Sequence, residues 1–442
     1  MLPPIPVETI EHAISFLRGD IPSLAACSLT CRALLPISRV QLWHEVLLPV
    51  QSDGSHSSRT ETFIGVLNRN PAIAPYVRSL VLHPRESLGN RAVPFNRAAL
   101  NTLSPRLPAL CSLRLRCLSM QCLYEVVTLI RDLPTLEALY LENVNLGGTD
   151  WARGWPRQHV PPAAGAVGGP PPVWALRTLS LSGGATPGAE VARLAHFLEW
   201  ARDSEYLPML ESLDFCSTLL SPDPSGTGGD MIAPGIPSFG SSLRHFGTVL
   251  WDVEVDMSVS VEGREHVKLI MSNLPRCGSL RSLYLQYDRR MPYISCMVRE
   301  KAFGIPQPFT PTPFFLEHLA DVLSAQGPAP LPFLESISLR FDGPASWLVG
   351  FEAAFARLAD ALVGNTMSVK GARRATEARR YPRFSHLRVR TSCLNMLKLI
   401  SRDGEAGIEE RRARQEAERV GLVLPMLANF VQAGVQVEVT CD

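Results

Sequence analysis

The stretch that decides the fold is LPTLEALYL at residues 133–141, because the chain repeats its pattern of leucines. The pattern reads Leu-Pro-x-Leu-x-x-Leu-x-Leu. Strong copies are LPALCSLRL at 107–115, LPMLESLDF at 207–215, LPFLESISL at 331–339 and, with three extra residues after its proline, LPRCGSLRSLYL at 274–285. Copies that lack the Leu-Pro are VRSLVL at 77–82, LRTLSL at 176–181, LRHFGTV at 243–249 and FSHLRV at 384–389. Such recurrence predicts a repeat architecture.

Each copy is predicted to be a short β-strand that follows a helix and a proline-containing stop. Successive side chains of a strand point to opposite faces, so Leu139 and Leu141 are expected to face the core. Tyr140 and Glu142 are expected to face outward. Apolar residues at helical spacing precede most strong copies. These residues are Leu123, Val126, Val127, Ile130 and Leu133; Val191, Leu194, Leu198 and Ala201; Val267, Ile270, Met271 and Leu274; Phe315, Leu319 and Leu323; and Leu348, Phe351, Phe355, Leu358 and Leu362.

Neither a helix nor a strand of this kind can bury its apolar side alone, so we expect the units to stack into an α/β solenoid over residues 60–442. The Gly/Pro-rich stretches 147–173 and 221–241 are predicted to be loop insertions in this array. The charged stretches 370–383 and 409–419 are predicted to be solvated helix or linker. The final VQVEV at 435–439 is predicted to be a closing strand or cap.

The first fifty residues predict a separate module of three short helices. Asp20 and Pro22 have the types expected of a helix cap and a first-turn proline. The three apolar stripes are Ile10, Ile14 and Leu17; Leu24, Cys27, Cys31 and Leu34; and Val40, Trp43 and Leu47. A unit this small buries little surface by itself, so we expect part of its apolar surface to be covered by a partner.

Composition narrows the class of protein. The net charge is +1, from 43 basic and 42 acidic residues, so no overall field favours nucleic acid or a membrane surface. The N-terminus lacks the pattern of a secretory signal, and no stretch approaches the ~18 apolar residues that a membrane helix needs. The ten cysteines are scattered, which favours reduced thiols and a location in the cytoplasm or nucleus.

Motifs for chemistry are missing from the sequence. It contains no phosphate-binding G-x-x-x-x-G-K-[ST], no H-E-x-x-H, no C-x-x-C and no G-x-S-x-G. Cys27 and Cys31 are four residues apart, but their apolar neighbours favour packing over metal binding. The basic run from Arg373 to Arg383 favours a solvated linker over a nucleic-acid contact. No catalytic residue, cofactor or metal is therefore predicted, and an enzyme remains an alternative only if polar residues converge in a pocket.

The opening segment resembles an F-box. Ile5-Pro6-Val7-Glu8 matches the start of the family pattern, Leu24…Cys27-Ser28-Leu29-Thr30-Cys31-Arg32 its middle and Leu42-Trp43 its end. The usual leucine, valine and tryptophan are replaced by Ile5, Thr30 and Leu34. The array that follows is similar to the irregular leucine-rich repeats of many fungal F-box proteins. This resemblance implies an F-box-like module at residues 1–50 followed by a right-handed βα horseshoe.

The resemblance further implies a substrate-recognition adaptor of a cullin–RING ubiquitin ligase. In that family the F-box docks onto a Skp-type linker protein, which joins it to the cullin scaffold, and the repeats bind the target protein. The alternative is a scaffold of the same build that transfers no ubiquitin. The residues expected to contact the linker protein are Ile5, Pro6, Ile10, Ile14, Leu24, Leu29 and Trp43, of which Ile10 and Ile14 could equally belong to the core of the module.

Outward residues of the predicted strands are the candidates for contacting the target. Aromatic and arginine side chains are favoured as interface anchors, so Tyr140, Tyr284, Arg340 and Arg388 are the first choices. Most outward residues of any one interface contribute little, so the alternative for any single one of them, that it is merely solvated, is the more frequent outcome. The full predicted set is Arg114, Arg116, Tyr140, Glu142, Asp214, Tyr284, Gln286, Arg340, Arg388 and Arg390.

Overall fold

The chain forms two compact units, residues 1–185 with 205–209 and residues 186–204 with 210–442. The structure is a computed structural model. It describes residues 6–50, 58–84, 93–95, 97–120, 123–142, 144–146, 175–182, 209–215, 242–251, 267–268, 270–288, 313–325, 329–342, 348, 350–364, 380–391, 413, 417 and 420–441. The predicted α/β class is confirmed, with strands that pair in parallel and helices between them.

The first unit opens with the three predicted helices, α1 (Val7–Ser15), α2 (Ile21–Thr30) and α3 (Leu34–His44). Asp20 caps α2 as expected, because its carboxylate accepts hydrogen bonds from the Ser23 hydroxyl at 2.6 Å and the Ser23 amide at 3.1 Å. These two hydrogen bonds lower the pKa of Asp20. Helix α3 ends at His44, and the chain passes directly into strand β1 (Glu45–Val50). Leu47 therefore lies in a strand, not in the third helix as predicted, because pairing with β2 overrides the helical spacing.

The sheet of the first unit has the parallel strand order β1-β2-β4-β6-β8. Its further strands are β2 (Ser79–Pro84), β4 (Ser112–Arg116), β6 (Ala138–Glu142) and β8 (Thr178–Ser182). A small second sheet, ordered β3-β5-β7, contains β3 (Val93–Pro94), β5 (Leu118–Met120) and β7 (Asn145–Leu146). The helical segments between strands are α4 (Ser58–Arg69), η1 (Pro71–Tyr76), α5 (Arg97–Leu103), η2 (Ser104–Arg106) and α6 (Leu123–Asp132).

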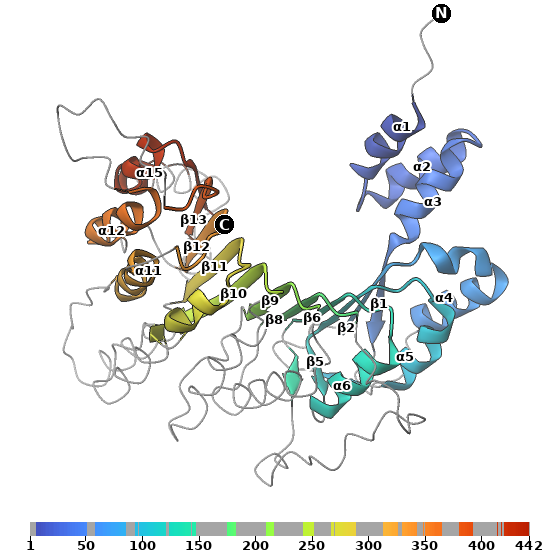
Figure 1. The fold of residues 1–442 in the computed structure, drawn as a ribbon. Helices are drawn as coiled ribbons and strands as arrows, with labels where there is room; N and C mark the ends of the chain where they lie inside the picture. The colour runs from blue at the N-terminus through green and yellow to red at the C-terminus, as the bar shows by residue number, and fades with distance from the viewer. Residues whose placement is uncertain are drawn as a thin grey trace, which may run out of the picture. The chain divides into compact units, whose positions relative to one another are not determined.

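Leucines of the repeat pattern face the core as predicted. Leu139 and Leu141 are buried, whereas Tyr140 and Glu142 are half-exposed. Figure 1 shows α1 and α2 projecting beyond the β1 end of this unit's sheet, whereas α5 and α6 lie along the sheet.

The repeat pattern corresponds to one backbone motif, a tight turn followed by a strand. In the copy at 107–115, the Leu110 amide donates to the Leu107 carbonyl at 3.1 Å. The amides of Cys111 and Ser112 then both donate to the Arg78 carbonyl of the preceding copy, at 3.0 and 2.9 Å. The copies that begin at 133, 331 and 381 form the same turn, with amide-to-carbonyl distances of 2.9, 3.1 and 3.1 Å. Proline fits the second position because that residue donates no hydrogen bond in the turn.

The second unit has a six-stranded parallel sheet ordered β9-β10-β11-β12-β13-β14. The strands are β9 (Ser212–Phe215), β10 (His245–Trp251), β11 (Ser282–Asp288), β12 (Ser336–Asp342), β13 (His386–Thr391) and β14 (Gln436–Cys441). Its helical segments include η6 (Leu274–Arg276), α11 (Phe314–Ser324), α12 (Glu352–Val363) and α15 (Ala428–Gln432). The predicted closing strand is confirmed as β14.

The core of the second unit lies between its sheet and its helices. Phe341 of β12 packs near Phe315 of α11, at 6.0 Å between ring centroids, and near Phe355 of α12, at 6.4 Å. The copies of the repeat at 274, 331 and 384 each follow a predicted helical stripe. The apolar residues of these three stripes are buried, which confirms the stripes. The predicted helical stretch at Val191–Ala201 and the predicted loops at 147–173 and 221–241 lie outside the described residues.

Two copies have a different register from the one predicted. In the copy at 274–285 the turn is closed by the Leu280 amide and the Cys277 carbonyl at 2.9 Å, so Cys277-Gly278 stands in the place of Leu-Pro. That copy therefore has no inserted residues, and Leu274 belongs to η6 before the turn. The copy at 384, predicted to lack the opening Leu-Pro, has the whole pattern. Tyr381 fills the first leucine position and is fully buried.

The end of the predicted solvated stretch 370–383 is packed into the second unit. The Tyr381 hydroxyl donates to the Leu323 carbonyl at 2.9 Å, and the Arg380 guanidinium donates to the Ser324 carbonyl at 2.9 Å. Both carbonyls lie in the last turn of α11, where helical partners are missing. The prediction was wrong for these residues because charge pattern alone does not reveal a helix end that needs donors. Residues 370–379 lie outside the described part of the chain.

Candidate protein-binding surfaces

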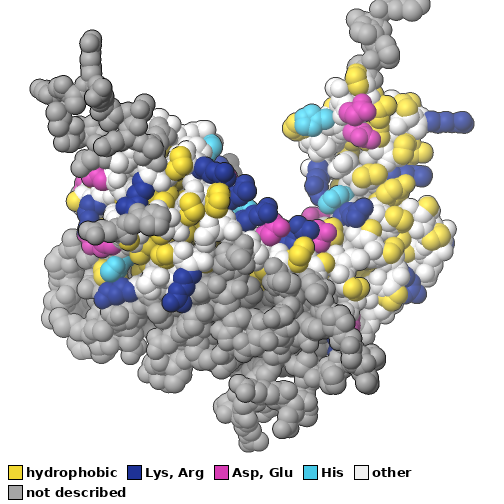
Figure 2. Space-filling model, in the orientation of Figure 1, with side chains coloured by type: hydrophobic (Ala, Val, Ile, Leu, Met, Phe, Trp, Pro, Cys, Tyr) yellow, Lys and Arg dark blue, Asp and Glu magenta, His cyan; other side chains and the backbone are white. Residues whose placement is uncertain are grey.

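The helical module, residues 7–44, keeps large apolar side chains on its surface. Leu29 is 85% exposed and Phe16 is 74% exposed, although Ile14 and Leu24 form a buried core between the same helices. Among the described residues, twelve large apolar side chains are exposed, and five of these lie in this short module. Figure 2 shows apolar side chains spread over its surface. The module therefore folds with apolar surface left uncovered.

The seven residues predicted to contact a linker protein differ in how far they are exposed to solvent. Leu29 and Pro6 are exposed, whereas Ile10 and Trp43 are half-buried. Ile14, at 5% exposure, and Leu24, at 0%, are core residues of the module and present almost no surface. Ile5 lies outside the described residues.

Trp43 packs the helical module against the rest of its unit. Its ring stacks on Phe63 of α4, with 6.3 Å between centroids and 24° between planes. The His44 carbonyl also accepts the amide of Arg78 at 3.0 Å, just before β2. Trp43 therefore makes its contact within the chain, and the surface open to a partner lies nearer α1 and α2.

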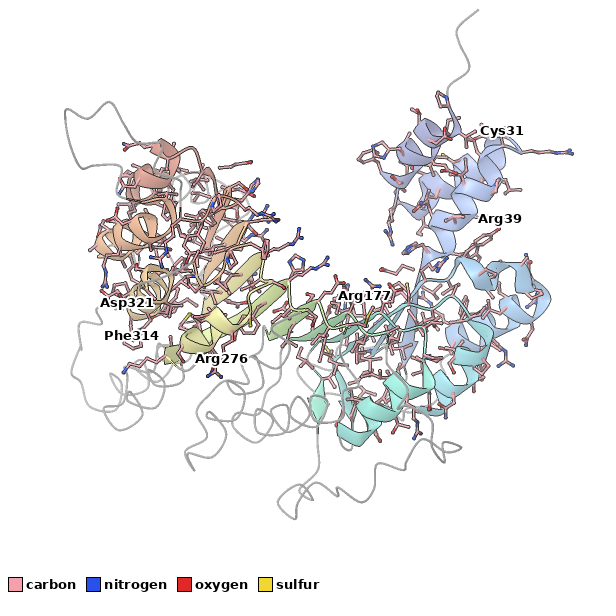
Figure 3. The ribbon with its side chains drawn as sticks, viewed as in Figure 1. Cys31, Arg39, Arg177, Arg276, Phe314 and Asp321 are labelled. Atoms are coloured by element: carbon pink, nitrogen blue, oxygen red, sulfur yellow. The ribbon has the colours of Figure 1, made fainter. Side chains whose placement is uncertain are left out.

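Three exposed apolar residues were missed by the sequence argument. Val7 is 57% exposed and Ile21 is 52% exposed, each at the start of a helix, and Phe16 follows the end of α1. They fall outside the helical stripes from which candidates were chosen. Their position at helix ends, with Phe16 and Ile21 on either side of the Gly19 turn, was the available signal, because side chains at such ends have few neighbours to cover them. Figure 3 labels two further exposed residues of the module, Cys31 and Arg39.

His44 links the end of α3 to the segment after α1. Arg18 lies 3.0 Å from Nε2 of His44, a contact in which the guanidinium donates and the neutral imidazole accepts. Burial lowers the pKa of His44, the positive charges of Arg18 and Arg78 lower it further, and Glu45 opposes them. The neutral ring is therefore the form that the folded module favours.

Four of the residues predicted to contact the target form one cluster on the outward face of the first unit's sheet. Arg114 and Arg116 both reach Glu142, at 3.1 and 2.6 Å from its two carboxylate oxygens. The Arg114 guanidinium also lies 4.8 Å from the centre of the Tyr140 ring. Parallel register pairs Arg114 with Tyr140 and Arg116 with Glu142, so the cluster follows directly from the aligned leucines.

The outward face of the second unit places the other six predicted residues in two rows. One row runs Asp214, Gly247, Tyr284, Ser338, Arg388 and Glu438 through paired positions of β9 to β14. The next row runs Gln286, Arg340 and Arg390. Within the first row, Arg388 donates to Glu438 at 2.6 Å through Nη2. Asp214 lies over Gly247, where an added Cβ would come within 2.5 Å of its Oδ1 atom.

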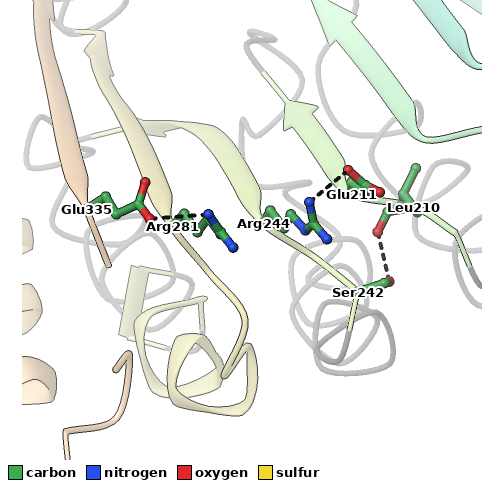
Figure 4. Close-up of polar contacts among 6 residues, drawn as sticks. All are labelled: Leu210, Glu211, Ser242, Arg244, Arg281 and Glu335. Carbon is green, nitrogen blue, oxygen red and sulfur yellow. Dashed lines mark hydrogen bonds and ion pairs between the residues drawn. The ribbon is translucent and has the colours of Figure 1, made fainter. Parts of the chain in front are cut away.

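Charged residues also alternate where the strands of the second unit begin. Arg244 lies 3.7 Å from Glu211, and Arg281 lies 3.3 Å from Glu335. The Ser242 hydroxyl donates to the Leu210 carbonyl at 2.8 Å. Figure 4 shows these contacts side by side along the sheet. Because each pair joins neighbouring copies and is partly exposed, it aligns the repeats while adding little stability.

Groups suited to covalent or metal chemistry do not gather in the described residues. No cluster of three or more His, Cys, Asp or Glu side chains with metal-binding geometry occurs there. Burial raises the pKa of the Cys277 thiol to about 11, which keeps it protonated. The described helices include none with both the length and the apolar character to cross a membrane.

Comparison of the chain with models of known protein families gives no match, and comparison with curated proteins gives none either. The surfaces described above are therefore what indicates a function for this chain.

Proposed function

We propose that the protein is a substrate-recognition adaptor of a cullin–RING ubiquitin ligase. The helical module is an F-box-like element that docks onto a Skp-type linker protein, and the strands belong to an irregular leucine-rich-repeat array that binds the target. The observation that carries the proposal is the apolar surface of α1 and α2 that stays exposed after the module has folded.

Burial of that surface would contribute favourable free energy to docking. Covering one large apolar side chain contributes about 1.5–3 kcal/mol, and Leu29, Phe16, Val7 and Ile21 are all more than half exposed. Leu29 lies within the segment that matches the F-box pattern, so the resemblance and the exposure point to the same residue. The contact area is centred on α1 and α2, because Trp43 is already packed on Phe63.

The polar outward face of the strands supports a role in holding a target. Arg114 and Arg116 are held by Glu142, and Arg388 is held by Glu438, so their guanidinium groups are positioned before any partner arrives. Preorganised side chains lose less conformational entropy on binding than mobile ones. Tyr140 and Tyr284 add aromatic surface of the kind enriched in interface anchors.

A binding measurement with purified proteins tests this function. Wild-type chain is expected to bind a Skp-type linker protein, and Leu29→Asp is expected to weaken binding by about thirtyfold or more, the effect of losing an interface hot spot. Phe333→Asp is the matched control, because Phe333 is an exposed apolar residue of the second unit. Absence of wild-type binding, or equal affinity of Leu29→Asp and wild type, contradicts the proposal.

A scaffold that transfers no ubiquitin is the second candidate. It is favoured by Trp43, the last residue of the F-box-like pattern, whose half-buried ring already stacks on Phe63 of the same chain. The two candidates differ in whether proteins held by the strand face become ubiquitinated when linker, cullin and RING components are supplied. Ubiquitination that is lost in Leu29→Asp supports the ligase adaptor, and capture without ubiquitination supports the scaffold.

A further inference from the structure

Arginine supplies nearly all of the positive charge of this protein. Of its 43 basic residues, 39 are arginine and four are lysine, at positions 268, 301, 370 and 398. Every basic residue among the first 267, which include the helical module and all strands of the first unit's sheet, is an arginine. Lysine is ordinarily among the commonest residues of soluble domains, so this balance departs strongly from the usual one.

Some of these arginines occupy positions that only a guanidinium group fits. Arg388 donates to Glu438 through both Nε, at 2.7 Å, and Nη2, at 2.6 Å. The Arg383 guanidinium lies 4.7 Å from the centre of the Phe333 ring. The ammonium group of lysine reproduces neither a planar fork nor stacking on a ring, so the contacts alone explain the choice of arginine at these positions.

Other arginines occupy positions where a lysine would serve as well. Arg39 of α3, Arg59 of α4 and Arg276 of η6 are exposed, and their side chains form no hydrogen bond or ion pair with the described part of the chain. Figure 3 labels Arg39 and Arg276. Lysine would keep the charge at these positions and has a similar helix propensity. What distinguishes arginine from lysine there is its chemistry, because it makes no contact that lysine would lose.

The chemical difference that bears on the proposed function is nucleophilicity. In ubiquitin transfer, a neutral lysine ε-amine attacks the thioester that joins the C-terminus of ubiquitin to the cysteine of a conjugating enzyme. An isopeptide C–N bond forms, the C–S bond breaks, the cysteine leaves as its thiolate and the amine releases a proton to water. Lysine, with a pKa of about 10.4, supplies some neutral amine, whereas a guanidinium with a pKa above about 12 stays protonated and does not attack.

An adaptor that docks on a ligase keeps its own side chains near the conjugating enzyme. Tethering of this kind gives a group an effective concentration of about a millimolar, so the amines of the adaptor would compete with those of a bound target. The basic residues on the outward strand faces, where the target is proposed to bind, are all arginines and add charge without a competing amine. They are Arg114, Arg116, Arg340, Arg388 and Arg390.

We propose that this arginine-based surface directs ubiquitin to the bound target and confines modification of the chain itself to its few lysines, with Lys268 as the acceptor. The inference rests on the proposed function and adds a regulation to it, since the adaptor is spared while its target is modified. Lys268 is the one lysine among the described residues. It is exposed, and it lies on the helical segment before η6 between Val267 and Ile270, which are buried and hold that segment to the unit.

Self-ubiquitination of the full chain tests the proposal, in a ligase reconstituted from linker protein, cullin, RING subunit and conjugating enzyme. A triple variant with Arg39→Lys, Arg59→Lys and Arg276→Lys keeps the charge of the surface. It is expected to be modified about twofold faster than wild type or more, because three exposed amines join the four lysines of the chain. Peptide mass spectrometry should find ubiquitin on the introduced lysines. The matched control replaces the same three arginines with glutamine and is expected to react at the wild-type rate.

A second variant tests the acceptor. Lys268→Arg is expected to lose the ubiquitin conjugate at that position while its affinity for the linker protein stays that of wild type. Modified wild type that carries no ubiquitin on Lys268 overturns the assignment of this acceptor.

Failure of this inference is distinguishable from failure of the proposed function. If wild type binds the linker protein but the triple lysine variant is modified no faster than wild type, the protective role of arginine is overturned and the proposed function stands. If wild type does not bind the linker protein at all, the proposed function is contradicted and this inference is overturned with it.

Discussion

Helices α1 and α2 of the helical module and helices α11 and α12 of the second unit have similar apolar patterns but opposite outcomes. In α11, Phe315, Leu319 and Leu323 are exposed by 3% or less, because a sheet and a neighbouring helix cover them. In the module, Leu29 and Phe16 remain exposed because no sheet lies against α1 and α2 among the described residues. Apolar residues in the array thus stabilise the chain itself, and those of the module are available to a second protein.

The largest expected effect is on the array side of this comparison. Phe355→Ala removes a fully buried ring from the cluster around Phe341 and should lower the free energy of unfolding by about 3–5 kcal/mol. Chemical denaturation followed by fluorescence or circular dichroism measures this. A loss below about 1 kcal/mol would mean that the aromatic cluster is not a tightly packed core.

A smaller loss is expected at the helix end held by Tyr381. Tyr381→Phe leaves the Leu323 carbonyl without its buried donor, which should lower the free energy of unfolding by about 1–3 kcal/mol. The hydrogen-exchange rates of the α11 amides should rise as this free energy falls. Unchanged exchange in the last turn of α11 would show that the hydroxyl does not hold that end.

The junction between module and sheet should depend on pH through His44. Burial and the charges of Arg18 and Arg78 lower the pKa of His44 in the folded state, so the unfolded state binds this proton at higher pH. The stability that neutral His44 contributes is therefore present above its ordinary pKa of about 6.5 and is lost as pH falls through the lower, folded value.

His44→Gln removes this titration and serves as the reference. The difference in stability between wild type and His44→Gln should shrink as pH falls below about 6.5 and stay constant above it. Thermal melts between pH 5 and 8 measure it. A difference that grows as pH falls would reverse the sign of the argument.

The smallest effect on stability is expected at Leu29. Leu29→Ala should change the free energy of unfolding by less than about 0.5 kcal/mol, because the side chain is 85% exposed, while binding of the linker protein falls. Comparing denaturation with binding affinity separates the two. A large loss of stability would place Leu29 in a core and remove the distinction between module and array.

The sequence by itself determined the local rules of this protein. The Leu-x-Leu alternation predicted which strand residues are buried, since side chains of a strand alternate between faces whatever its neighbours are. The helical spacing before each copy predicted α6, α11 and α12, and Asp20 predicted the start of α2. These features depend on residues close together in the chain.

Only the tertiary structure decided which residues meet partners far along the chain. Leu47 became a strand residue because β2 pairs with it, and Tyr381 was buried because the end of α11 needs a donor. Cys277 took a leucine position because its turn aligns with the neighbouring copies. Such outcomes depend on contacts between distant segments, as does the exposure of Leu29, which no local pattern records.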